Sequence, residues 1–300
     1  MNHTLTLTRD RMRLAMRNRA FLFFSMIMPL AFLFLFLGIF ARGNQMAVSF
    51  MFGPVLALTV MGSFWGLSIQ LVMFREQGIL RRFRLAPVSA AELLASSVLS
   101  NYILTLPTIV IQFILARWVF HLPSVGNLWG VAVLVTLGTF AFATLGLVVA
   151  SVTNTMQETQ VINNAIWFVF LFLSGATFPL AILPSWVRNF SNFLPATYLV
   201  HGLQEVLQNS RRLGAILEEI GALAVLTLFA FFLSVQLFRW EPEAKVTRRA
   251  KLWAASTIIP FLLLGGWETR YGHLREQTNT NFQMMQRGPA APSPQPDDHR

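Results

Sequence analysis

The residues best suited to contact a partner form one short charged block between two long apolar runs. The block covers residues 74–94, FREQGILRRFRLAPVSAAELL, and includes Glu76, Arg81, Arg82 and Arg84. Exposed carboxylate and guanidinium groups form ion pairs and charge-assisted hydrogen bonds across protein interfaces. The block therefore predicts a docking element. Arginines beside apolar runs also set the topology of membrane proteins, and the block alone does not separate these two roles.

The local pattern of this block predicts a short helix followed by a defined turn. Its apolar residues share one arc at 100° per residue, and they are Ile79, Leu80 and Phe83. Arg81 and Arg84 lie on the opposite arc, which makes the helix amphipathic. Pro87 is expected to end it. Ser89 and Glu92 then have the S-x-x-E spacing of a capping box, which satisfies the first free amides of the next helix.

The patterns that catalysis, nucleotide binding or metal binding require are missing. The chain has no cysteine, and its lysines, Lys245 and Lys251, are not preceded by glycine as in a P-loop. His121 and His201 lie at the edges of apolar runs, and Glu158 lies in a short connection. We therefore expect no cofactor, no metal and no ATPase site of its own. An intramembrane enzyme would need convergent ionisable groups within the apolar runs, where they are costly and usually functional.

The composition indicates a membrane protein. The chain has 55% hydrophobic and 12% charged residues, whereas a soluble domain carries roughly twice that charged fraction. A net charge of +10 would suggest nucleic acid binding in a soluble protein. Here the basic residues lie beside apolar runs, where anionic lipid headgroups and topology explain them, so we expect no nucleic acid partner.

Uncharged apolar runs predict an all-α polytopic membrane protein with six transmembrane helices. A bilayer core needs roughly 20 apolar helical residues. The expected spans are residues 20–41, 46–73, 93–116, 128–152, 161–178 and 220–238. The first is too long for the apolar region of a cleavable signal peptide, so we expect it to be retained.

The distribution of basic residues predicts a cytoplasmic N-terminus. Basic residues gather in the ranges 9–19, 75–84 and 239–251, and the opposite connections carry fewer, namely Arg42, Arg117, Arg188, Arg211 and Arg212. Cytoplasmic connections carry the excess of Lys and Arg, so the charged block is expected inside. The connection 153–160 has no basic residue. Residues 1–19 form a basic amphipathic pattern, expected to lie in the headgroup plane, although they also suit a plain topogenic charge cluster.

Between the fifth and sixth runs, residues 173–208 are too apolar for a solvated loop. Pro179, Pro184 and Pro195 divide the segment into pieces too short to cross a bilayer. The pattern favours re-entrant helices that line an outer gate, with Phe178 and Tyr198 deeper than a tip at 181–185. A surface loop anchored by aromatic residues such as Trp186 is the alternative.

Several residues within the spans are expected to join helices. The polar ones favour interhelical hydrogen bonds, and they are Asn101, Gln112, Asn163, Asn164 and Gln236. Gly62 and Gly66 have the spacing of a close helix contact. Beyond residue 240, residues 241–269 form a basic linker with a short apolar segment at 252–267, either a seventh span or an interfacial helix. Residues 270–300 read as a disordered proline-rich tail.

Three motifs in order resemble the permease subunits of ABC-2 type exporters, over roughly residues 5–240. They are RNRAFLFFSMIMPLAFLFLF, FREQGILRRFRLAPVSAAELL and SGATFPLAILPSWVRNFSNFLPATYLVHGLQEVL. The resemblance implies an N-terminal interfacial helix over 1–19, a transmembrane domain over 20–240, a cytoplasmic coupling helix and re-entrant extracellular helices. The implied ATPase-coupling residues are Glu76, Gly78, Arg81, Arg82, Arg84 and Pro87. The implied extracellular gate residues are Gly175, Phe178, Pro179, Pro184, Trp186 and Pro195.

The function expected from this resemblance is ATP-driven export of a lipophilic or amphiphilic molecule across a bacterial inner membrane. The subunit would work as a homodimer with a separate ABC ATPase subunit, in contact with membrane lipids. A glycan exporter, a membrane scaffold that does not transport and an intramembrane enzyme remain as alternatives. Stimulation of ATP hydrolysis by a cargo would separate an exporter from a scaffold.

Overall fold

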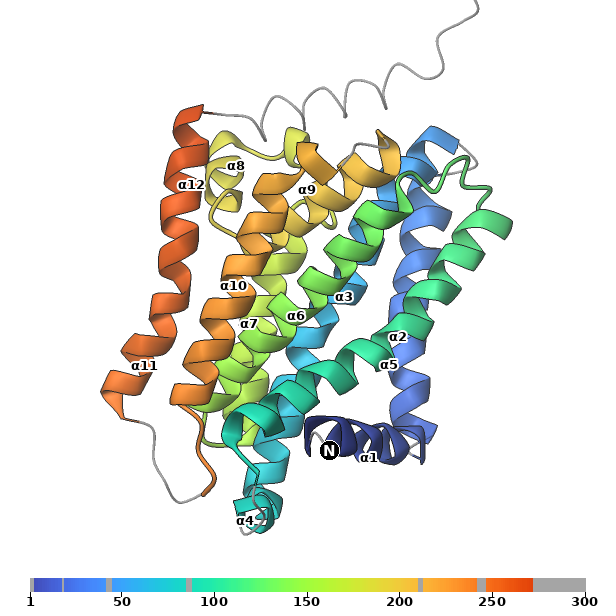
Figure 1. Cartoon of the computed structure of the whole chain (residues 1–300). Helices are drawn as coiled ribbons and strands as arrows, with labels where there is room; N and C mark the ends of the chain where they lie inside the picture. Colours follow the sequence, from blue (N-terminus) through green and yellow to red (C-terminus); the bar gives the residue numbers. More distant parts are fainter. Residues whose placement is uncertain are drawn as a thin grey trace, which may run out of the picture.

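The chain folds as a helical bundle in the computed structural model, which describes residues 3–17, 19–41, 45–84, 88–209, 213–241 and 247–271. These residues are nearly all helical and include no strand. Helices that run between the two ends of the bundle make up most of it (Figure 1). Four of them are long and apolar enough to cross a membrane, namely α3 (Gln45–Glu76), α5 (Ala90–Trp118), α6 (Leu128–Val152) and α10 (Leu217–Gln236). The predicted all-α class is confirmed.

The first and fifth apolar runs also form helices, with bounds that differ from the expected ones. The first run forms α2 (Arg19–Phe36), which contains Pro29 and continues as a short π-helical turn, Leu37–Ala41. The fifth forms α7 (Met156–Leu173), which ends before the expected residue 178. Gly175 has a φ of +87°, a conformation that residues with a Cβ rarely adopt, so the chain turns away there.

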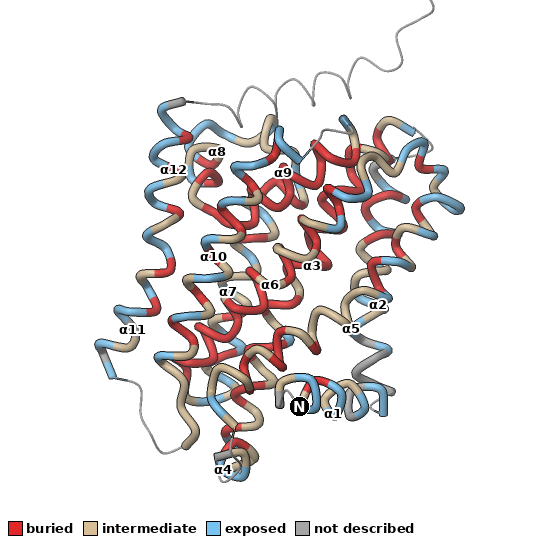
Figure 2. Tube along the Cα trace, viewed as in Figure 1, coloured by how far each residue is buried: buried red, intermediate tan, exposed pale blue. Residues whose placement is uncertain are grey.

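The core lies around α3. Within its most apolar segment 89% of the residues are buried, against 28% for α5 at the edge of the bundle (Figure 2). α6 packs closely on α3, because Gly146 of α6 lies against the backbone of Phe64 and a Cβ at this position would collide with the Phe64 carbonyl. The helix at the centre therefore has little freedom to move without α6.

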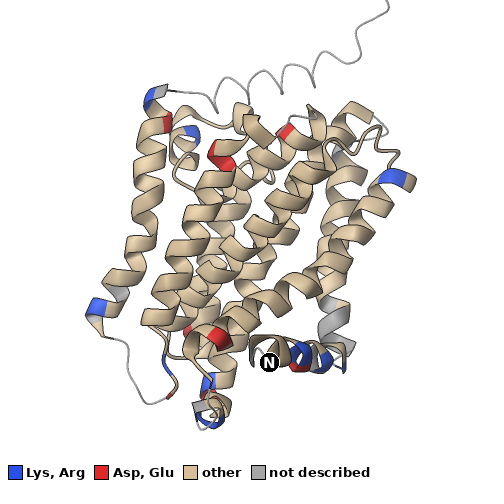
Figure 3. Cartoon of the chain, viewed as in Figure 1, with Lys and Arg blue, Asp and Glu red and all other residues tan. Residues whose placement is uncertain are grey.

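Charged side chains gather at the two ends of the bundle, and the middle is apolar (Figure 3). α1 (His3–Arg17) lies across one end, beside the projecting α4 (Ile79–Arg84). The opposite end carries the short α8 (Ser185–Ser191) and most of α9 (Pro195–Gln208). This separation of charge is what a bilayer imposes on a protein that crosses it.

The C-terminal apolar segment packs along the bundle. α11 (Arg248–Ala255), a 3₁₀ turn (Ser256–Ile258) and α12 (Ile259–Tyr271) follow one another beside α10 (Figure 1). The ring of Phe261 lies 6.2 Å from that of Tyr198 in α9. Each helix alone is shorter than a bilayer span, but in sequence they run along α10 from one end of the bundle to the other (Figure 1). Nearly all of the expected tail 270–300 lies outside the described residues.

Candidate coupling, gating and binding sites

α4 is a short amphipathic helix anchored by one residue. Leu80 is fully buried in an apolar cluster with Leu93 and Leu94 of α5. Arg81 and Arg82 are exposed on the other side of the helix. The predicted helix is confirmed. Arg84 is its last residue, but its side chain is outside the described part of the structure, as is Pro87.

Local chemistry fixes both sides of α4. Gly78 has a φ of +69°, and its N–H donates to the Arg75 carbonyl at 3.0 Å, which ends α3 and turns the chain into α4. Beyond α4, the Glu92 N–H donates to Ser89 Oγ at 3.2 Å, and the Ser89 N–H donates to Glu92 Oε2 at 2.9 Å. The predicted capping box is confirmed, so the block enters α5 in a defined direction.

Arg75 lies inside the protein, although its sequence position marked it as a topological charge. Its side chain is 2% exposed, and it donates to the carbonyls of Ala150 at 2.9 Å and Thr153 at 2.6 Å. Arg239 donates to the same Thr153 carbonyl at 2.7 Å. These carbonyls form the negative end of α6, where a cation is stabilised. The connection 153–160 has no basic residue of its own, but the side chains of Arg75 and Arg239 reach its first residue. No local sequence pattern indicates these contacts.

Glu76 joins the charged block to α7. Its Oε1 accepts a hydrogen bond of 3.0 Å from the Met156 N–H, the first amide of α7. Helix N-termini favour a carboxylate at this position. Glu76, the last residue of α3, therefore ties the start of the charged block to the start of α7.

α1 contacts the same block from the side. The guanidinium of Arg11 lies over the ring of Phe74, 5.6 Å from its centroid, within the range of a cation–π interaction. Burial lowers the pKa of Arg11 to about 10, so the side chain stays charged at neutral pH. The N-terminal helix and the end of α3 are thus held together.

Between α7 and α10, the prolines begin the short elements as expected. Pro179 precedes a 3₁₀ turn, Leu180–Ile182, Pro184 precedes α8, and Pro195 is the first residue of α9. α9 is buried along most of its length, whereas Trp186 of α8 is 69% exposed.

The depths of two aromatic residues in the segment between α7 and α10 differ. Tyr198 is 3% exposed, and its hydroxyl donates to the Asn192 carbonyl at 2.9 Å, as predicted for a deep residue. Phe178 is 37% exposed and stacks on Phe172. The prediction that Phe178 lies deep in the fold is therefore wrong. The reason is that α7 ends at Leu173 and leaves Phe178 in the turn after it.

The structure brings together ionisable residues that sequence reasoning kept apart. His201 Nδ1 lies 2.7 Å from Glu219 Oε1, and Glu205 Oε1 lies 3.9 Å from the other ring nitrogen. All three residues are buried. The spacing of His201 and Glu205 places them on one helix face. Glu219 lies just before the expected sixth span, and no sequence pattern indicates that it contacts these two residues.

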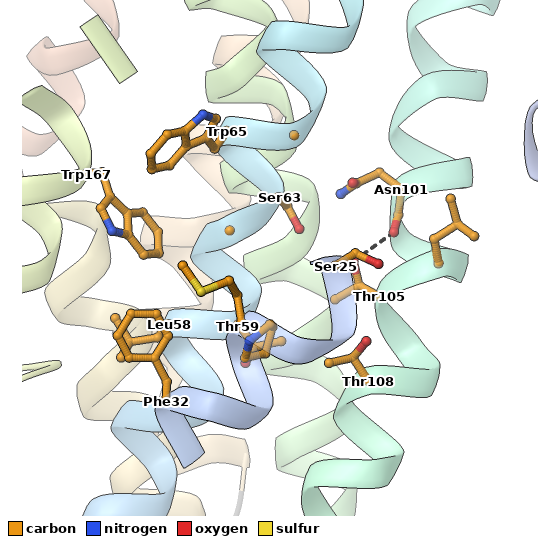
Figure 4. A pocket seen from close by; sticks show the side chains of 15 residues that line it. Ser25, Phe32, Leu58, Thr59, Ser63, Trp65, Asn101, Thr105, Thr108 and Trp167 are labelled. Atoms are coloured by element: carbon orange, nitrogen blue, oxygen red, sulfur yellow. Dashed lines mark hydrogen bonds between the residues drawn. The ribbon is translucent and has the colours of Figure 1, made fainter. Parts of the chain in front are cut away.

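A cavity of about 480 Å³ opens between α2, α3 and α5 (Figure 4). Small-molecule sites have this size and are mostly apolar with a few polar groups. Its lining residues are Ser25, Met28, Pro29, Phe32, Leu58, Thr59, Gly62, Ser63, Trp65, Gly66, Asn101, Leu104, Thr105, Thr108 and Trp167. No side chain among the described residues approaches the open side of Gly62 or Gly66 within 4 Å. These glycines therefore line the cavity and form no close contact with another described helix.

Two of the expected interhelical polar residues are confirmed. Gln112 accepts a hydrogen bond of 3.0 Å from Thr59 Oγ1 and donates to the Pro29 carbonyl at 3.1 Å, which joins α5 to α3 and α2. Asn163 of α7 donates to Ser68 Oγ at 2.7 Å. These contacts fix the helices around the cavity.

The family model described as ABC-2 type transporter matches residues 2–207. The chain belongs to the ABC-2 type transporter family. This match runs from α1 through nearly all of α9, so it includes the charged block, the cavity helices and the short helices after α7. α10, α11 and α12 lie beyond it.

Relatives of this ABC-2 type transporter chain include permeases of other transporters. Linearmycin resistance permease protein LnrN of Bacillus subtilis (strain 168) is 28% identical over 182 residues, 61% of this chain and 47% of that protein. ABC transporter G family member 20 of Dictyostelium discoideum is 27% identical over 140 residues, 47% of this chain and 19% of that protein. Nodulation protein J of Bradyrhizobium diazoefficiens is 30% identical over 105 residues, 35% of this chain and 40% of that protein. The chain spans less than half the length of each relative.

Proposed function

We propose that this chain is the permease subunit of an ATP-driven exporter that moves a lipophilic or amphiphilic molecule out of the cytoplasm. Family membership and the apolar cavity support this function. In this proposal α2, α3, α5, α6, α7 and α10 are six spans of a bacterial inner membrane. The N-terminus and α4 lie on the cytoplasmic side, where basic residues are favoured.

The observation that carries the proposal is the geometry of α4. Leu80 fixes the helix to the bundle, Gly78 and the capping box fix its ends, and Arg81 and Arg82 face outward. A rigid, charged projection suits a protein partner whose motion must reach the membrane helices. We assign that partner as an ABC ATPase subunit, because permeases of this family normally work with one. Two permease subunits would form the complex with it.

The segment between α7 and α10, residues 173–208, is proposed as the gate of the same exporter, and we call it the outer segment. Short elements that begin at Pro179, Pro184 and Pro195 would dip into the outer leaflet, where irregular backbone is tolerated only when protein buries it. The burial of α9 supports this placement. Gly175 supplies the turn from α7 into the segment.

The cargo is proposed to be an amphiphile. The cavity walls are largely apolar, and its described lining contains no charged residue. The Bacillus relative is named for resistance to linearmycin, which is compatible with a drug-like cargo. A highly charged polymer would find no counter-charge in this cavity.

Purification with and without a co-expressed ABC ATPase subunit tests the function. The permease alone should not hydrolyse ATP, and the complex in vesicles should hydrolyse ATP faster when a cargo is added. Hydrolysis by a preparation proven free of ATPase subunits would contradict the proposal. An assembled complex that never responds to any amphiphile would favour a scaffold.

A further inference from the structure

Two polar groups that line the cavity are buried without a hydrogen-bond partner among the described residues. They are Ser63 Oγ of α3 and Asn101 Nδ2 of α5. Ser63 is only 4% exposed. Two other polar side chains of the cavity are paired, since Thr105 Oγ1 donates to the Asn101 carbonyl at 2.8 Å and Thr59 Oγ1 donates to Gln112. Buried polar groups are nearly always paired, so an unpaired couple facing one cavity points to a ligand.

The two groups converge on one place. Figure 4 shows the side chains of Ser63 and Asn101 pointing toward each other across the space between α3 and α5. An amide N–H donates only, whereas a hydroxyl donates or accepts. A ligand oxygen that accepts hydrogen bonds, such as a carbonyl, ether or hydroxyl oxygen, would satisfy both groups at once.

The other side of the cavity is aromatic. The rings of Trp65 and Trp167 pack edge to face with centroids 6.1 Å apart, and Phe32 lies farther along the wall in Figure 4. Gly62 and Gly66 leave the surface of α3 open between the aromatic and polar sides. An apolar chain would fit along this open surface.

Charge decides the class of the ligand. No Asp, Glu, Lys, Arg or His occurs among the described lining residues. An ion held at membrane depth without a counter-ion is strongly disfavoured, whereas a neutral polar group needs only its hydrogen bonds. The site therefore selects against anionic amphiphiles, whereas the faces of Trp65 and Trp167 can still attract a cation.

We propose that this cavity binds one electrically neutral amphiphile, with its acceptor oxygen between Ser63 and Asn101 and its apolar chain along Gly62 toward Trp65 and Trp167. The assignment of this ligand as cargo rests on the exporter function proposed above, but the binding itself does not. A neutral bilayer lipid has the same chemistry, and the test must separate the two sources.

Tryptophan quenching by brominated probes tests the site. The full chain is placed in phosphatidylcholine nanodiscs and titrated with a terminally brominated fatty amide or the matching brominated alkyl sulfonate. The amide should quench saturably and bind at least about tenfold more tightly than the sulfonate, because the anion lacks a counter-ion in the cavity. Replacing both Trp65 and Trp167 with Phe should remove this saturable component.

Two variants locate the binding in the cavity. Gly62→Leu should abolish saturable quenching by filling the space beside an unobstructed glycine. Gly221→Leu is its control, because Gly221 is also helical and unobstructed but is exposed on α10, away from the cavity. Asn101→Leu keeps the side-chain volume similar and should weaken amide binding by about tenfold, the effect of one lost hydrogen bond.

The outcomes separate binding from transport. Equal binding of the two probes, or unchanged quenching in both Gly62→Leu and Asn101→Leu, would overturn the site. With the ATPase partner present, faster ATP hydrolysis on adding the amide supports its role as cargo. Saturable amide binding that leaves hydrolysis unchanged supports the site with a bilayer lipid as its occupant, and contradicts the cargo role alone.

Discussion

His201 Nδ1 lies 2.7 Å from Glu219 Oε1, and this contact joins α9 to the first turn of α10. Both side chains are buried, and they lie 18 positions apart in the sequence. Hydrogen bonds to a charged group are stronger than neutral ones, and removing one partner leaves the other unpaired. The pair therefore holds the outer segment to the helix that follows it.

Replacing Glu219 should measure this connection. Glu219→Ala should lower the free energy of unfolding by about 3 kcal/mol, because it leaves His201 buried without its partner. Glu219→Gln should cost less, since the amide can still form a hydrogen bond. Thermal unfolding of the purified subunit in detergent measures both. Glu218→Ala, at the exposed neighbouring position, is the control, and an equal loss in all three variants would contradict a specific role for the pair.

Arg75 is expected to stabilise the end of the bundle that carries α1 and α4. Arg75→Ala removes hydrogen bonds to two carbonyls at the end of α6 and should cost about 3 kcal/mol. Arg75→Lys keeps the charge but not the two-pronged geometry, so it should recover only part of the loss. The exposed Arg249→Ala is the control in the same unfolding assay. A melting temperature unchanged by Arg75→Ala would show that these bonds contribute little.

Charge reversal on α4 should separate docking from membrane insertion. Arg81→Glu with Arg84→Glu should leave insertion largely intact, because other basic residues still mark the inner side. The same change should weaken binding of the ATPase subunit at least about tenfold through lost contacts and new repulsion. Co-purification and protease protection report the two effects. Reversal of Arg248 and Arg249 on α11 is the matched control. If the α4 variant binds the ATPase subunit and transports normally, the charged block only sets the membrane topology.

Cysteine labelling should map the outer segment, because the chain has no cysteine of its own. With an impermeant thiol reagent added outside, Ser185→Cys should react quickly, because Ser185 is exposed, and Ala196→Cys slowly, because Ala196 is fully buried. Mass spectrometry over time gives the two rates. Uniform fast labelling across 173–208 would indicate an ordinary solvated loop, and labelling only from the cytoplasmic side would refute the proposed topology.

Features set by neighbouring residues were predictable from the sequence. The α4 helix and the capping box at Ser89 and Glu92 depend on residues within one or two turns, and the structure contains both. The end of α7 was predicted too late because residues 174–178 remain largely apolar, and hydrophobicity alone does not reveal the positive φ of Gly175.

The features that the sequence could not provide all depend on distant residues. Arg75 reaches the Thr153 carbonyl 78 positions away, and Asn163 reaches Ser68 over 95 positions. A single sequence does not show which of these residues are partners, because many other polar side chains could form the same hydrogen bonds. The same limit hid the cavity, because Ser63 and Asn101 face each other only once α3 and α5 are packed.

The course of α11 and α12 along α10 has a consequence for access to the chain. Figure 1 places α1 and α4 at one end of the bundle and the close of α12 at the other. Across a bilayer these ends would face different compartments. A reporter fused after Tyr271 and one fused before α1 would then lie in different compartments. A protein that binds the chain after α12 would therefore act on the opposite side of the membrane from one that binds α4.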